Sequence, residues 1–366
     1  MLILRISVTA LLALGLVACS SAPAPTDPAA LPVNPPRPAT CVPETSTDLT
    51  TPDGWLNRVA TAPTTVGLVV DDGRGRVVSH EASTPFPMAS AVKVVHLTAY
   101  AAAVAGGRIR PDDRVALTDW ERWHLPGIDQ AHPAALKRLG EAPDYSVDQV
   151  VTAAIQESDN AAADWLRARL GDDALRAAAA PAGWTDVDLP SFSGSTARFA
   201  MPELAPAGAA RPELATVDAQ LGQRLADDAG FRAEVVRRYT GQVTADPQRF
   251  LTDQERWTAT TAVGTPAQLL GVYRALVAGS VPGADVAVRQ LTWQGPTIGF
   301  KGGSFVDVLT FGSFVRRTDG TTAYAVVLGR DLPVLPLTTQ QTAGQQEMAI
   351  DAARSTRGFD RVLCVA

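Results

Sequence analysis

The chain has 366 residues, of which 46% are hydrophobic and 19% charged, so it is long and apolar enough to bury a sizeable core and is not disordered throughout. Its 32 basic and 38 acidic residues give a formal net charge of −6, which offers no excess of positive charge for a phosphate backbone, so we do not expect nucleic acid as a partner. Three cysteines and four histidines without tight ligand spacing lead us to expect no metal and no cofactor.

The first residues have the pattern of a targeting segment. Arg5 precedes an apolar stretch over residues 6–15, and the following Leu16-Val17-Ala18-Cys19 resembles a bacterial lipobox. The sequence therefore predicts a signal peptide over residues 1–18, acyl chains on Cys19, and a mature protein anchored by lipid to the extracytoplasmic face of the bacterial cell membrane. The alternative is a chance cysteine at the end of a secretory segment.

Residues 19–48 form a proline-rich stretch with few large apolar side chains, which predicts a semi-extended spacer between the lipid and a folded domain. Cys41 lies late in this stretch, and Cys364 lies two residues before the C-terminus. Outside the cytoplasm the two can pair, and we expect a disulfide between them. Two unpaired thiols are the alternative.

The remaining chain, residues 49–366, has strand-like segments at both ends and mainly helical segments between them. In chain order we expect a helix from Pro52, a hairpin over 65–80, a buried helix over 90–105, helices over 147–155 and 161–170, strands over 297–301, 305–317 and 322–330, and a helix over 342–354. The pattern indicates one α+β domain. Its antiparallel sheet is formed by the N- and C-terminal strands and flanked by helices, with a mostly helical middle region.

One pair of side chains at the start of the 90–105 helix has the chemistry of an activated nucleophile. Ser90 and Lys93 are three residues apart and therefore share a helix face. In an apolar helix Lys93 is desolvated, which favours a neutral amine that can take the Ser90 proton; arginine could not do this. Taken alone, a serine three residues before a lysine is commonplace and carries little meaning.

Two later motifs favour a functional interpretation of the Ser90 and Lys93 pair. Ser158-Asp159-Asn160 lies between two helices, and Lys301-Gly302-Gly303-Ser304 follows a strand-like run. Each alone reads as a turn, but Ser-x-x-Lys, Ser-Asp-Asn and Lys-x-Gly in this order form the signature of class A β-lactamases and penicillin-binding proteins. Moreover, only three lysines occur in the chain, and two of them fall on its lysine positions.

The chain therefore resembles the serine β-lactamase and DD-peptidase superfamily, in its class A-like branch. The resemblance implies an acylated nucleophile at Ser90 and a proton acceptor at Lys93. It also implies a proton relay through Ser158 to the leaving nitrogen, a substrate-amide contact at Asn160 and a carboxylate contact at Lys301. The backbone N–H groups of Ser90 and Ser304 would form the oxyanion hole, with Gly302 and Gly303 in the substrate-binding strand.

Two departures bear on activity. The family's Lys-Thr-Gly is Lys301-Gly302-Gly303 here, which removes a hydroxyl, although Ser304 could supply one a residue later. The family's Glu-x-x-Leu-Asn segment, whose Glu activates the deacylating water, matches best at Met201-Pro202-Glu203-Leu204-Ala205, which aligns Met201 with the Glu. We therefore expect weak deacylation, with Glu203 as a residue whose role is open.

Two function classes remain. The first is a serine acyl-enzyme hydrolase or transferase acting on β-lactams or on D-alanyl peptides of peptidoglycan, which we favour. The second is a catalytically impaired lipoprotein of the same fold that serves as a binding module in the cell envelope.

Overall fold

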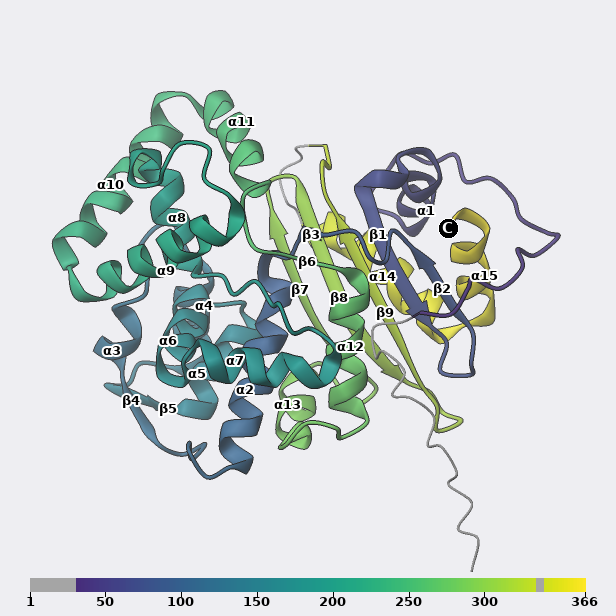
Figure 1. Cartoon of the computed structure of the whole chain (residues 1–366), viewed down its shortest axis with the longest axis horizontal. Helices are drawn as coiled ribbons and strands as arrows, with labels where there is room; N and C mark the ends of the chain where they lie inside the picture. Colours follow the sequence, from purple (N-terminus) through teal and green to yellow (C-terminus); the bar gives the residue numbers. More distant parts are fainter. Residues whose placement is uncertain (1–30, 334–338) are drawn as a thin grey trace, which may run out of the picture.

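The computed structural model describes residues 31–333 and 339–366 (Figure 1). Cys19 and the predicted signal peptide lie outside these residues. The helices are α1 (Pro52–Thr61), α2 (Lys93–Ala105), α3 (Leu117–Glu121), α4 (Ala131–Leu139), α5 (Val147–Gln156), α6 (Asn160–Leu170), α7 (Asp172–Ala179), α8 (Phe192–Ala200), α9 (Arg211–Asp227), α10 (Ala229–Ala245), α11 (Pro247–Thr258), α12 (Pro266–Val277), α13 (Ala284–Leu291), α14 (Thr339–Arg354) and α15 (Thr356–Val365). The strands are β1 (Val66–Asp71), β2 (Val77–His80), β3 (Phe86–Pro87), β4 (Arg114–Ala116), β5 (Asp144–Ser146), β6 (Val263–Gly264), β7 (Ile298–Phe305), β8 (Val308–Arg316) and β9 (Thr322–Gly329).

The central sheet has the strand order β2-β1-β9-β8-β7, and every neighbouring pair is antiparallel. Strand β1 from the N-terminal part pairs with β9 from the C-terminal part, with Val69 opposite Val326. The predicted hairpin, the C-terminal strands and the closure of the sheet by both ends of the chain are confirmed. The fold is α+β, as predicted.

The two faces of the sheet carry separate hydrophobic clusters because side chains alternate along each strand. On β9, Ala325 and Val327 pack into a cluster with α1, α14 and α15, whereas Val326 and Leu328 belong to the larger cluster around α2. Figure 1 shows α1, α14 and α15 on one side of the sheet and the helical body on the other.

Four successive helices, α8 to α11, form a unit at the end of the helical body (Figure 1). Helices α8 and α9 pack closely on each other, and α10 contacts both. Their small apolar cluster includes Leu221, Leu225, Phe231 and Val235. Glu203, whose role the motifs left open, lies between α8 and α9, and this unit borders the cavity described below.

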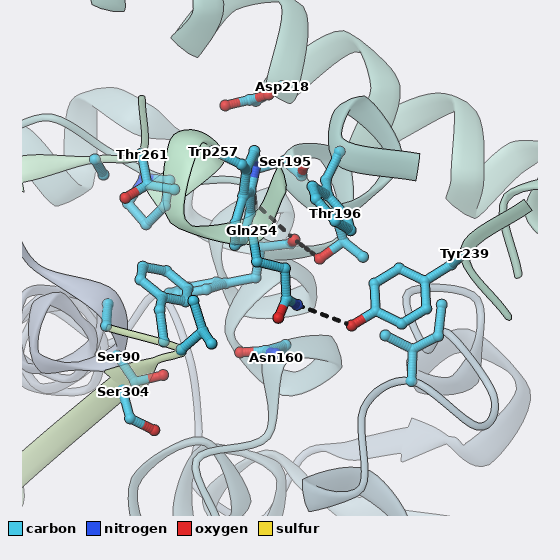
Figure 2. Close-up of a pocket in the computed structure, with 18 of the residues that line it drawn as sticks. Ser90, Asn160, Ser195, Thr196, Asp218, Tyr239, Gln254, Trp257, Thr261 and Ser304 are labelled. Carbon is cyan, nitrogen blue, oxygen red and sulfur yellow. Dashed lines mark hydrogen bonds between the residues drawn. The ribbon is translucent and has the colours of Figure 1, made fainter. Parts of the chain in front are cut away.

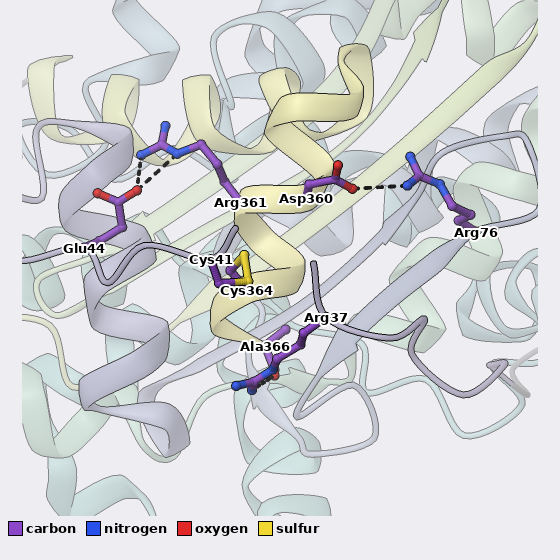
Figure 3. The surroundings of a disulfide bond; sticks show 8 residues. All are labelled: Arg37, Cys41, Glu44, Arg76, Asp360, Arg361, Cys364 and Ala366. Carbon is purple, nitrogen blue, oxygen red and sulfur yellow. Dashed lines mark hydrogen bonds and ion pairs between the residues drawn. A yellow bond between two sulfur atoms is a disulfide. The ribbon is translucent and has the colours of Figure 1, made fainter. Parts of the chain in front are cut away.

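Residues 31–48 are not a free spacer, which corrects the expectation for this part of residues 19–48. Asn34 exchanges hydrogen bonds with both backbone groups of Ser79 on the edge strand β2, at 2.8 Å each. The predicted disulfide joins Cys41 to Cys364 on α15, and Glu44 binds Arg361 beside it (Figure 3). Polar side chains and one cross-link thus hold a segment that has little apolar surface of its own. Residues 19–30 lie outside the described part of the chain.

Within that described part, no helix is both long and apolar enough to cross a membrane.

Candidate active site

Ser90 lies in a short 3-10 turn (Ala89–Val92) that leads directly into α2, of which Lys93 is the first residue. The preceding Ala89 has φ of +43°, a left-handed conformation that is costly for a residue with a Cβ. The turn is held from two sides, because Met88 donates its N–H to Ala262 and accepts a hydrogen bond from the Thr310 hydroxyl on β8. Ser90 is thereby fixed at the junction of the helical body and the sheet.

Ser158 comes from the helical side, in the loop between α5 and α6. It also has a left-handed backbone, with φ of +67°. Lys93 Nζ donates to the Ser158 carbonyl at 2.6 Å, to the Ser158 Oγ at 3.3 Å and to Asn160 Oδ1 at 2.7 Å. The structure therefore brings together the first two motifs predicted from the sequence.

Lys301 comes from the sheet side, on the edge strand β7. Its Nζ donates to the same Ser158 Oγ at 3.1 Å and to the carbonyl of Gly302 at 2.5 Å. Both lysines are buried, whereas the third lysine, Lys137, is exposed. The Ser158 hydroxyl thus lies between two buried amines.

Burial governs the protonation of both amines. It lowers the pKa of Lys93 from its ordinary value to about 8, although the carboxylates of Asp129, Asp159 and Asp164 act in the opposite direction. Burial, and to a smaller extent the nearby charge of Lys93, lowers the pKa of Lys301 well below its ordinary value. A neutral amine that can accept a proton is therefore accessible near neutral pH.

Strand β7 passes very close to the backbone of Ser90. A Cβ added to Gly303 would lie 2.3 Å from the Ser90 nitrogen and 2.8 Å from that of Ala91, so only glycine fits at this position. The next residue, Ser304, lines the same cavity as Ser90. The backbone positions predicted for an oxyanion hole are thus adjacent in space. Gly302 has more room, since its added Cβ would be 3.3 Å from the Thr310 carbonyl oxygen.

Phe192, at the start of α8, is the residue that covers Lys93. Its ring centre lies 4.4 Å from Lys93 Nζ. The buried carboxylate of Asp164 holds this segment by accepting from the backbone N–H groups of Phe192 and Ser193, at 2.9 and 2.8 Å. A phenyl ring, which cannot accept a proton, therefore occupies the space beside the amine.

Met201 and Glu203, which the sequence alignment placed at this point, lie elsewhere. Met201 packs on the apolar cluster of α8 to α10, and Glu203 is about half exposed and lies 3.7 Å from Arg238. The segment that reaches Lys93 begins at Phe192, nine residues before Met201, and the alignment of Met201 with the family's Glu stays a prediction. The only sequence signal for that segment is Ser191, which caps α8.

A second feature that the sequence did not reveal is a buried polar group behind the Ser158 loop. Asp129 accepts from the Asn160 N–H at 3.1 Å, and His132 Nδ1 lies 2.9 Å from the Asp159 carboxylate. Burial and the neighbouring Asp159 raise the pKa of Asp129. These contacts fix the backbone of the loop. They could not be predicted from the sequence, because no short motif marks the residues that make them.

The cavity that contains Ser90 has a volume of about 670 Å³. Figure 2 shows Ser90 and Ser304 together on one side of it, with Asn160 nearby and Tyr239 on the opposite side. Of the described residues that line it, the one carboxylate is Asp218. Asp218 is occupied by two guanidinium groups, those of Arg198 at 2.6 Å and Arg211 at 3.0 Å.

The arrangement is that of a serine hydrolase site, with a fixed serine, buried amines of lowered pKa and backbone donors beside the serine. A model described as the β-lactamase enzyme family matches residues 56–280. The chain belongs to this family, and with it to the superfamily of serine β-lactamases and penicillin-binding proteins. None of the curated proteins matched the sequence.

Solved structures share the fold at low sequence identity. A β-lactamase from Sphaerobacter thermophilus is 20% identical, with a TM-score of 0.54 over 84% of this chain and 97% of that chain. A variant of the last common ancestor of Gram-negative class A β-lactamases is 18% identical, with a TM-score of 0.53 over 84% and 98%. A PBP-A mutant in an acyl-enzyme complex with penicillin G is 16% identical, with a TM-score of 0.50 over 85% and 99%.

Proposed function

We propose that this protein is a serine acyl-enzyme that reacts with β-lactams or with D-alanyl peptides of the cell wall and that releases the acyl group slowly. In the acylation step the Ser90 oxygen attacks the carbonyl carbon, and the Ser90 proton passes to the neutral amine of Lys93. The carbon–nitrogen bond then breaks, and the leaving nitrogen takes a proton from the Ser158 hydroxyl, which recovers one from a neighbouring ammonium. Atoms and charge balance without a cofactor.

The remaining predicted residues bind the substrate in this proposal. The N–H groups of Ser90 and Ser304 stabilise the oxyanion, Asn160 binds the substrate amide, and Lys301 attracts the carboxylate. Gly303 allows the strand to approach Ser90. The PBP-A mutant in complex with penicillin G supports a β-lactam as a substrate of this superfamily.

The single observation that carries the proposal is the environment of Lys93 Nζ. Its hydrogen bonds to Ser158 and Asn160 equip it for acylation. The phenyl ring of Phe192, 4.4 Å away, cannot activate water as a carboxylate could. Since Asp218 is already bound by two arginines, the described cavity residues offer no free carboxylate for the second step.

A fluorescent penicillin tests the proposal against the alternative of a binding module. We expect covalent labelling of the purified protein, and none of the Ser90→Ala variant. The matched control is Ser280→Ala, which removes the hydroxyl of an exposed serine outside the cavity lining and should still be labelled. Absence of labelling in the wild-type protein would favour a binding module that retains the fold without turnover.

We further propose that the mature protein is anchored by lipid at Cys19 to the extracytoplasmic face of the membrane. The support is the lipobox-like Leu16-Val17-Ala18-Cys19, together with a disulfide that suits an oxidising compartment. Cys19→Ala should shift the protein from the membrane fraction to the medium or leave the precursor unprocessed. A processed variant that stays in the membrane fraction would contradict the anchor.

A further inference from the structure

The cavity beside Ser90 extends well beyond the reacting groups. Its far side is an aromatic wall, which we define as Phe199 of α8, Tyr239 of α10, Trp257 of α11 and Phe305 of β7. Its rings contact one another in edge-on or tilted arrangements: Phe199 lies 5.7 Å from Tyr239 and 5.4 Å from Trp257, and Trp257 lies 5.0 Å from Phe305. Such a connected set of rings is rigid and offers a large apolar surface.

The polar atoms of this wall are already bound to neighbours within the protein. Gln254 Nε2 donates to the Tyr239 hydroxyl at 3.3 Å, and Trp257 Nε1 donates to the Ser195 carbonyl at 3.1 Å (Figure 2). Leu251, six residues before Trp257 on α11, adds an aliphatic side chain to the same lining. What the wall itself offers a ligand is therefore mainly ring faces and methyl groups.

The charges beside the wall cancel. Arg211 lines the cavity but binds Asp188 at 2.7 Å and Asp218 at 3.0 Å. Arg198 completes the group by binding Asp218 at 2.6 Å, so two guanidinium groups face two carboxylates. This part of the cavity presents no free charge to attract a charged substrate group, and burying a charge there would be costly.

We infer that the aromatic wall is the binding site for an apolar, ring-sized side chain on the acyl group that is transferred to Ser90. The inference rests on the proposed function in one respect, because it attaches the occupant to the carbonyl that Ser90 attacks. The volume of about 670 Å³ lies within the range of about 300–1,000 Å³ that is usual for pockets that hold whole drug-sized ligands. Helices α10 and α11 thereby select the acyl donor, while the motif residues perform the reaction.

Two penicillins that differ only in this side chain provide the test. Benzylpenicillin carries a phenylacetamido group, and 6-acetamidopenicillanic acid keeps the amide but replaces the benzyl group by methyl. We expect the second-order rate constant for acylation of Ser90, followed by intact-mass spectrometry, to be about 10- to 100-fold higher for benzylpenicillin, as for the burial of one ring. Equal rate constants in the wild-type protein would overturn the inference and leave the proposed function standing.

A charge placed beside the aromatic wall tests whether this part of the cavity causes the difference between the two rate constants. Leu251→Asp should lower the ratio of the two rate constants at least about tenfold, because a carboxylate beside the ring must be desolvated. The matched control is Gln248→Asp, which adds the same charge at an exposed position of the same helix and should keep the wild-type ratio. An unchanged ratio in a folded Leu251→Asp protein would also overturn the inference.

If neither penicillin acylates Ser90, the proposed function fails, and binding then decides the inference by itself. Calorimetry with the Ser90→Ala protein measures the Kd of each compound without any reaction. Tighter binding of benzylpenicillin would support an apolar subsite at the aromatic wall, and equal Kd values would overturn it.

Discussion

The two sides of the cavity are built in opposite ways. The reacting side gathers polar groups from distant parts of the chain, such as Lys93, Ser158 and Lys301, and buries both lysines with hydrogen bonds to Ser158. The far side is contributed mostly by consecutive helices, α8 to α11, and consists of aromatic rings whose polar atoms are hydrogen-bonded to neighbouring protein groups. Chemistry restricts the residue types on the first side, whereas on the second any set of rings that packs well will serve.

The largest effect is expected from the amine at the centre of the reacting side. Lys93→Met keeps the volume and removes the proton acceptor, so the acylation rate constant should fall about 10²- to 10⁴-fold. The neutral fraction of Lys93 grows as pH rises. Because its pKa is lowered to about 8, most of this change falls near neutral pH. Acylation should therefore rise about tenfold per pH unit below 8 and level off above it, measured by stopped-flow labelling. A pH-independent rate would contradict this role.

The next largest effect is expected from disturbing the close approach of β7 to Ser90. Gly303→Ala places a methyl group 2.3 Å from the Ser90 nitrogen and must displace one of the two backbones. Loss of an oxyanion donor costs about 10²- to 10³-fold, and we expect a fall of this size in the acylation rate constant. Gly302→Ala is the control, because its added carbon meets its nearest neighbour only at 3.3 Å. Equal rates in the two variants would show that Gly303 is not essential to the donor geometry.

Phe192 distinguishes acylation from deacylation. Phe192→Glu puts a carboxylate beside Lys93 while Asp164 still holds the backbone of the segment. The half-life of the acyl adduct should shorten at least about tenfold, because a general base is supplied for water. Phe192→Gln has the same shape without a base and should not shorten the half-life in this way. The same half-life in both variants would contradict the explanation of slow release.

The disulfide should affect stability and leave the reaction unchanged, since it lies with α15 on the opposite face of the sheet from the cavity. Replacing Cys41 and Cys364 together by serine should lower the free energy of unfolding by about 2–5 kcal/mol in urea titrations. Arg37→Ala removes only a hydrogen bond to the Ala366 carbonyl and should cost about 1 kcal/mol or less. A stability loss no larger than that of Arg37→Ala would show that the remaining contacts suffice to hold residues 31–48.

The sequence predicted the reacting side well because its chemistry restricts both residue type and order. Ser90 with Lys93, and the two flanking motifs, could be recognised and were found together. The sheet was predictable for a similar reason, since the alternation of side chains along a strand is a local signal.

The far side and the surroundings of Lys93 could not be predicted in this way. Phe192, Tyr239 and Trp257 are apolar residues in helical segments, and such residues indicate burial without saying against what they pack. The contact of Phe192 with Lys93 depends on how a long segment folds back, and no local sequence signal indicates it. Residues 31–48 were mistaken for a spacer because side-chain hydrogen bonds, such as those of Asn34, leave no hydrophobic pattern.

The most direct test of slow release is an intact-mass time course after a single addition of benzylpenicillin. The hydrogen bonds of Lys93 to Ser158 and Asn160 support acylation, whereas the proposed slow release follows from the lack of a free carboxylate among the described cavity residues. We predict a rapid gain of one penicilloyl mass on Ser90 that persists for many times the acylation half-life, with little hydrolysed penicillin in solution. A rapid return to the unmodified mass with multiple turnovers would contradict this prediction and identify the protein as an efficient β-lactamase.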